Sequence, residues 1–281
     1  GAVCSCTGAF FMGGFTSAGT EFRLYVYDPV ANTIVSKGKI STPNPGSGVH
    51  NGDLVFDSVG NLYILRSSAN SNNSTTSTLT VFSVLAENLK DATASTTLQA
   101  TALDDVSISM GAANGVAFDS AGKAYLQVTP NNTSGSISSF DLPKFNNRQN
   151  ILTSSGNLAG VTDLASCSAP PAVRLQKEVV GERFSNSDQF KLTLHDESQE
   201  LVAVTTDGPS SGLQTKVAGP VLTQRGEPIT FAETFTGSDS YATTYKCVAT
   251  NTTPLAVDTE PVTISEGTGT SGTFNVPTAS E

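Results

Sequence analysis

Four cysteines are the residues whose chemistry the sequence constrains most closely. Cys4 and Cys6 lie two residues apart, on one face of an extended strand, and are too close for an unstrained disulfide bond to each other. Cys167 is therefore the expected partner of one of them, and that bond would close residues 1–167. One amino-terminal cysteine and Cys247 remain. They could join two molecules, or the partner of Cys247 could be missing from this sequence.

Other reactive residue types are scarce. The two histidines, His50 and His195, are expected in different domains, which makes a histidine-based zinc or hydrolase site improbable. The net charge is −10 and no basic patch is present, so we expect no nucleic-acid partner. No apolar run approaches the roughly 20 residues of a membrane span, and we expect that any export signal has been removed or was left out of this sequence. An acidic surface rich in serine and threonine fits a secreted or cell-surface protein.

The composition predicts an all-β protein. Serine and threonine make up about a quarter of the chain, which also contains 25 Gly, 13 Pro and no Trp. This composition excludes a helical bundle and favours short strands joined by polar turns.

One internal repeat is clear, because residues 51–63 (NGDLVFDSVGNLY) return at 114–125 (NGVAFDSAGKAY). Each copy predicts a strand, an Asp-Ser-x-Gly turn and a second strand. In such a turn the aspartate can accept backbone N–H bonds while the glycine takes a positive φ. The residues concerned are Asp57, Gly60, Asp119 and Gly122.

Repeated hairpins of this length indicate blade-like units, each of which cannot bury its own face. We predict three, at about 8–45, 50–103 and 113–155, in a small propeller-like domain. Residues 157–167 are expected to add one more inner strand that closes the ring. Residues 83–91 are the expected short helix.

The chain is thus predicted to form two domains. Residues 1–167 form the propeller-like domain, residues 168–172 (SAPPA) form a proline-rich linker, and residues 173–281 form a β-sandwich.

The second domain resembles the prealbumin-like, CnaB-type modules of Gram-positive, particularly actinobacterial, surface proteins. The segments that carry the resemblance are 173–181, 188–190, 218–221, 230–234, 243–247 and 267–274. The resemblance implies that Lys177 attacks the side-chain amide of an asparagine in the last strand while Glu233 transfers the protons, which gives an intramolecular isopeptide bond. Burial would align these groups and supply a high effective concentration.

The chain departs from that family pattern at its end. Such modules finish with a strand that carries a cysteine, the partner of Cys247, and then the reacting asparagine, and this sequence stops before that strand. We therefore expect a sandwich that lacks its last strand. Asn251 and Asn275 are possible substitutes for the asparagine, although neither lies at the family position.

The first domain is more loosely similar to NHL and gluconolactonase-like propellers through the Asn-Gly-x-x-x-Phe-Asp-Ser-x-Gly-x-x-Tyr pattern. In the lactonase-like enzymes such residues bind a divalent cation that polarises a carbonyl group. The corresponding positions are Asn51, Asn114 and Asp163. Blade turns are the favoured reading of the Asn-Gly pairs, because a hard cation needs more carboxylates than the sequence supplies.

Together these features predict an extracellular structural or adhesive protein without cofactor or enzymatic turnover, apart from a single self-cross-linking reaction. It would be a subunit of a surface filament, joined head to tail when residues 2–6 of one molecule complete the sandwich of the next. A host or glycan ligand is possible. The alternative is a metal-dependent lactonase-like or carbohydrate-binding head on a surface stalk.

Overall fold

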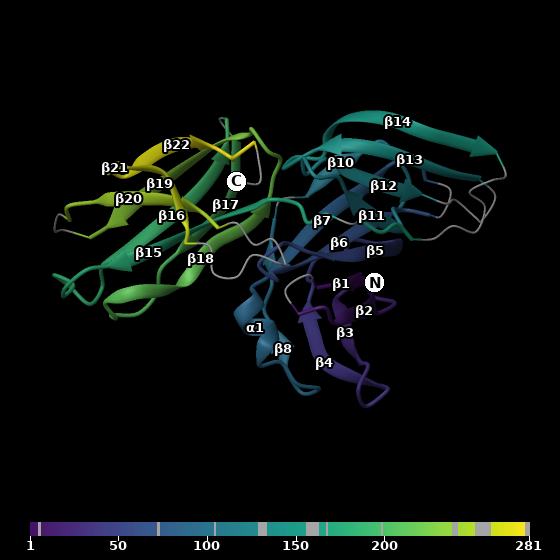
Figure 1. The fold of residues 1–281 in the computed structure, drawn as a ribbon, viewed down its shortest axis with the longest axis horizontal. Helices are drawn as coiled ribbons and strands as arrows, with labels where there is room; N and C mark the ends of the chain where they lie inside the picture. The colour runs from purple at the N-terminus through teal and green to yellow at the C-terminus, as the bar shows by residue number, and fades with distance from the viewer. Residues whose placement is uncertain are drawn as a thin grey trace. The chain divides into compact units, whose positions relative to one another are not determined.

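The computed structural model of the protein divides into two compact units, Gly1–Pro171 and Ala172–Glu281 (Figure 1). It describes residues 1–4, 7–71, 74–103, 105–128, 134–155, 163–166, 168–197, 199–237, 241–250 and 260–278. Strands account for 58% of the described residues and helix for 2%, so the all-β prediction is confirmed.

The described part of the first unit contains three sheets. The first has the order β1 (Ala2–Val3), β2 (Phe10–Phe15), β3 (Glu21–Asp28), β4 (Thr33–Ser41), β8 (Thr97–Leu98). The second has the order β10 (Val106–Ile108), β7 (Ser77–Val84), β6 (Leu62–Ala69), β5 (Val49–Phe56), with β9 (Thr101–Ala102) beside β7. The third has the order β11 (Gly115–Phe118), β12 (Ala124–Val128), β13 (Ser134–Asp141), β14 (Asn146–Ser155).

These sheets correspond to the three predicted blade-like units, but among the described residues no sheet closes and a propeller is not shown. Most of the predicted inner strand at 157–167, namely residues 157–162 and 167, lies outside the described residues, and 163–166 are not in a strand. The predicted helix is present as α1 (Ala86–Lys90), shorter than expected because β7 continues to Val84.

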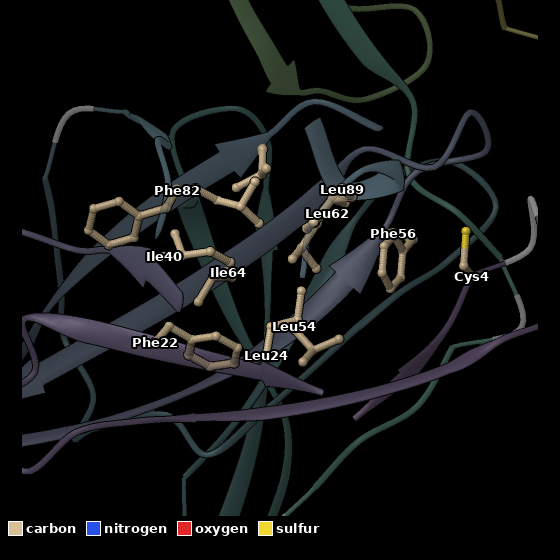
Figure 2. Packing of buried hydrophobic residues seen from close by; sticks show 13 residues of the cluster. Cys4, Phe22, Leu24, Ile40, Leu54, Phe56, Leu62, Ile64, Phe82 and Leu89 are labelled. Atoms are coloured by element: carbon tan, nitrogen blue, oxygen red, sulfur yellow. The ribbon is translucent and has the colours of Figure 1, made fainter. Parts of the chain in front are cut away.

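The second sheet is covered on both faces, which explains why β6 is buried almost throughout. Side chains alternate along a strand. Leu62 and Ile64 therefore face the first sheet, where they pack with Phe22, Leu24 and other residues of the core (Figure 2). Leu65 faces the opposite way and shares a small, water-sized pocket with residues of the third sheet.

Both copies of the repeat form the predicted turn. Asp57 Oδ1 accepts the N–H groups of Val59 and Asn61 at 3.1 and 2.9 Å, and Asp119 Oδ1 accepts two N–H groups in the same way. Gly60 and Gly122 have φ of 91° and 90°, which only glycine adopts readily. Each hairpin also contains a hydrogen bond that was not predicted. The Tyr63 hydroxyl donates to Asp57, and the Tyr125 hydroxyl donates to Asp119.

The second unit is built on a four-stranded sheet with the order β17 (Gln199–Thr205), β16 (Gln189–Asp196), β19 (Pro228–Thr236), β22 (Ser271–Asn275). Two separate pairs of strands accompany it. They are β15 (Ala172–Val179) with β18 (Gly212–Leu222), and β20 (Thr244–Ala249) with β21 (Val262–Thr268).

Candidate functional site

Lys177 and Glu233 meet inside the second unit. Lys177 Nζ lies 2.7 Å from Glu233 Oε2 and 3.0 Å from Oε1, and the side chains are only 13% and 10% exposed. Glu233 pairs with Leu192 across β19 and β16 and lies between two phenylalanines on the same face of β19. A carboxylate in such an apolar row breaks the usual pattern of a strand, and such a break marks a functional position.

Aromatic and cationic groups surround this pair. Lys177 Nζ lies 4.5 Å from the ring centroid of the fully buried Phe190, and the Arg183 guanidinium lies 5.5 Å from the same centroid. Arg183 is itself held by Ser210 O and Gln214 Oε1. The ring limits the directions that the lysine side chain can take and excludes water from one side of it.

The arrangement suits transfer of an acyl group to the lysine. Glu233 is in hydrogen-bond contact with Lys177 Nζ, so it can take the proton that the amine must lose before it attacks. The structure does not bring Asn275 to this place, because Asn275 pairs with Pro228, is exposed, and lies five residues along β19 from Glu233, about 16 Å. Asn251 lies outside the described residues.

The layer opposite the four-stranded sheet is divided. Among the described residues β15 pairs only with β18, and β20 pairs only with β21. Both nevertheless cover the same sheet, because Lys177 of β15 contacts Glu233 while the Tyr245 ring of β20 lies 4.9 Å from that of Phe231. β18 contacts β17, and the short turn 269–270 joins β21 to β22, so these strands lie toward opposite edges of the sheet. The unpaired edges of β15 and β20 therefore face each other, and we call the interval between them the seam.

Cys247 lies on the seam strand β20. It is on the same face as Tyr245, has a free thiol, and burial raises its pKa. The Thr243 end of β20 is level with Glu233, because Gly269 N donates to Thr243 O and Glu233 N donates to Thr270 O. Cys247 is four residues farther along, about 13 Å.

The cysteines of the first unit are placed only in part. Cys4 is 2% exposed and belongs to the core between the first and second sheets. Cys6 and Cys167 lie outside the described residues, so the predicted pairing stays a prediction.

The three residues of the alternative metal site, Asn51, Asn114 and Asp163, make hydrogen bonds or an ion pair within the first unit. Asn51 Nδ2 donates to Asn114 Oδ1 at 2.8 Å, which links β5 to the start of β11. Asp163 Oδ2 lies 3.4 Å from the Gly1 amino group, and Asp53 Oδ1 lies at the same distance from it. The described residues contain no group of three or more His, Cys, Asp or Glu side chains suited to a metal ion.

Asp53 was missed by the sequence reasoning, although a carboxylate before the apolar run Leu54–Phe56 is a signal. Its Oδ2 accepts Val116 N at 3.0 Å, which joins the second sheet to the third, and its Oδ1 accepts Leu54 N. Burial raises its pKa to about 6, Asp163 adds to the rise, and the two N–H groups and the Gly1 amino group oppose it.

A pH dependence of stability follows. Since the folded pKa lies above the unfolded value of 3.8, the stabilising contribution is complete below about pH 4 and is lost as the pH rises through about 6. We expect unfolding of the first unit to become easier from pH 5 to pH 8 by about 1.4 kcal/mol, because one pKa unit of the shift lies above pH 5. Asp53→Asn should flatten this slope in melting curves, and Asp91→Asn, at an exposed position, should not. An unchanged slope in Asp53→Asn would contradict the assignment.

A comparison with known protein families finds a match within the second unit. Residues 172–279 match the family model of a prealbumin-like fold domain of the SpaA type. No curated protein and no solved structure matches the chain. Within the described residues, no helix is both long and apolar enough to cross a membrane.

Proposed function

We infer that the protein is a pilin-like surface or adhesive protein, because residues 172–279 match a SpaA-type prealbumin-like domain and domains of this type are typically found at the cell surface. Beyond this, we propose that the protein is a structural surface subunit whose second unit receives an extended strand in the seam and bonds to it through Lys177. The observation that carries the proposal is the Lys177–Glu233 pair, held within hydrogen-bond distance beneath the seam, where β15 and β20 each have an edge that no described strand pairs with.

The reaction is a condensation that occurs once. The Lys177 Nζ–carbonyl bond forms, the carbon–nitrogen bond of an asparagine side chain breaks, and ammonia leaves. Glu233 takes a proton from Lys177 Nζ and passes it to the departing nitrogen. No oxidant or cofactor is needed.

The geometry of the seam also predicts how far apart a cysteine and an asparagine should lie on the added strand. Cys247 and the Lys177–Glu233 pair are about four residues apart along β20, and an even interval places both partners on the inward face of an added strand. The strand pairs that the structure describes in the second unit are all antiparallel. A strand antiparallel to β20 would therefore present a cysteine first and an asparagine four positions later.

Residues 2–6 of a neighbouring molecule meet this specification only in part. Cys4 or Cys6 could reach Cys247, but no asparagine follows either cysteine at four positions. In the structure Ala2–Val3 pairs with Phe10 and Phe11 of its own first sheet, so the segment would first have to leave that sheet.

A peptide experiment tests the proposal. The full chain is incubated with a ten-residue peptide of alternating strand-forming residues that carries Cys and Asn four positions apart, and is then reduced. We expect an adduct of the peptide mass less about 17 Da, attached at Lys177. A peptide with Ala for Asn, and a peptide of residues 1–10, should give no adduct after reduction. Absence of any adduct with the Cys–Asn peptide would refute the proposal.

A further inference from the structure

The outer face of the first sheet has an unusual composition. Along β3 the side chains of Phe22 and Leu24 are buried in the core, so Arg23, Tyr25 and Tyr27 face outward. An antiparallel sheet with one solvated face normally carries small polar or charged residues on that face. Here two tyrosines and an arginine stand in a line, at intervals of about 6.8 Å.

Neighbouring strands widen this line into a surface. Phe10 and Met12 of β2 lie opposite Tyr27 and Tyr25, and Ile34 of β4 lies opposite Tyr27 on the other side. Phe10 is 41% and Ile34 60% exposed. We call the six residues Phe10, Met12, Arg23, Tyr25, Tyr27 and Ile34 the aromatic face.

Two polar groups of the aromatic face differ in their contacts, the Tyr27 hydroxyl and the Arg23 guanidinium. The Tyr27 hydroxyl donates to Asn32 Oδ1 at 2.9 Å, which fixes the direction of the ring. Arg23 is exposed and has no ion-pair partner among the described residues, whereas its neighbour Lys39 is paired with Glu21. Arg23, Lys39 and Glu21 give this face a charge of +1 in a chain whose net charge is −10.

We propose that the aromatic face binds a glycan chain that carries carboxylate groups. The flat rings of Tyr25, Tyr27 and Phe10 offer apolar surface to the C–H faces of sugar rings, with hydroxyls at their edges for hydrogen bonds. Arg23, at the end of the line, can bind a carboxylate through two parallel N–H···O hydrogen bonds. The line spans about 14 Å along β3, so the ligand is elongated.

The charge of the face favours this ligand over nucleic acid. Single-stranded nucleic acid also stacks on aromatic rings, but its sites follow the backbone with a strongly basic groove. A face on which Arg23 is the one cation without an ion-pair partner among the described residues matches an occasional carboxylate better than a phosphate at every residue. The inference does not depend on the seam, so its failure would leave the proposed cross-link untouched, and the reverse also holds.

Affinity electrophoresis of the full chain tests the inference. The native gels contain polygalacturonate or the neutral glucan dextran, and a fluorescent oligothymidylate is tested by gel shift. We expect polygalacturonate to retard the protein at least about tenfold more strongly than dextran. Tyr25→Thr/Tyr27→Thr, which keeps strand-forming residues, should weaken the retardation at least about tenfold, and Arg23→Gln should remove the preference for the acidic glycan. Phe184→Thr, at an exposed aromatic residue of the second unit, is the matched control and should behave as the wild type.

Three results would overturn the inference. They are equal retardation by the two polysaccharides, retardation that persists in the folded double tyrosine variant, and a shift of oligothymidylate without retardation by polygalacturonate. Melting curves establish that the variants are folded.

Discussion

Arg66→Met is expected to destabilise the first unit by about 3–5 kcal/mol. Arg66 is 2% exposed, and its Nη1 donates to the carbonyl oxygens of Thr42 at 2.7 Å and Pro43 at 3.0 Å, while Nη2 donates to Asn44 O at 3.1 Å. Its guanidinium also lies 4.9 Å from the Phe82 ring centroid. Methionine fills a similar volume but removes the donor from the buried carbonyl of Thr42 and from the partly buried carbonyls of Pro43 and Asn44, so Thr42 O bears the largest desolvation cost.

Thermal unfolding of the full chain measures this effect. A loss of this size should lower the melting temperature of the first unit by about 10 °C and leave the transition of the second unit in place. Arg23→Met, at an exposed arginine, should change it by less than about 2 °C. A similarly small shift in Arg66→Met would show that the buried guanidinium is not what holds residues 42–44 against the second sheet.

Lys177→Arg is expected to abolish the covalent adduct with the Cys–Asn peptide. Arginine keeps the positive charge beside Glu233, but its guanidinium stays protonated and is not a nucleophile. Glu233→Gln keeps the shape of the site and removes the proton acceptor, so the adduct should form at least about 100-fold more slowly. Both rates come from intact-mass time courses.

Lys191→Arg supplies the matched control, because Lys191 lies on the adjacent strand β16 in an exposed ion pair with Glu200. It should react at the wild-type rate. An adduct that still forms on Lys177→Arg, or a Glu233→Gln variant that reacts as fast as the wild type, would contradict the assigned roles.

Features encoded within a few residues could be predicted from the sequence. The Asp-Ser-x-Gly turns at Asp57 and Asp119 formed as expected because the aspartate, the glycine and the N–H groups all lie within one turn. The approach of Lys177 to Glu233 followed only from the resemblance, since the two residues are 56 positions apart. The half-buried tyrosines of β3, Tyr25 and Tyr27, were not singled out from the sequence.

Features that depend on long-range packing could not be predicted. The acceptors of Arg66 are backbone carbonyls, which every residue carries, so no side chain in the sequence indicates them. The raised pKa of Asp53 depends on burial between two sheets.

Hydrogen–deuterium exchange tests the open seam most directly. The full chain is mixed with the peptide in which Ala replaces Asn, so that a strand can enter but cannot bond. We predict that amides in 172–179 and 244–249 become protected together, at least about tenfold, while those in 199–205 and 271–275 do not change. Protection at 199–205 or 271–275 instead, or no protection at a saturating peptide concentration, would contradict the account.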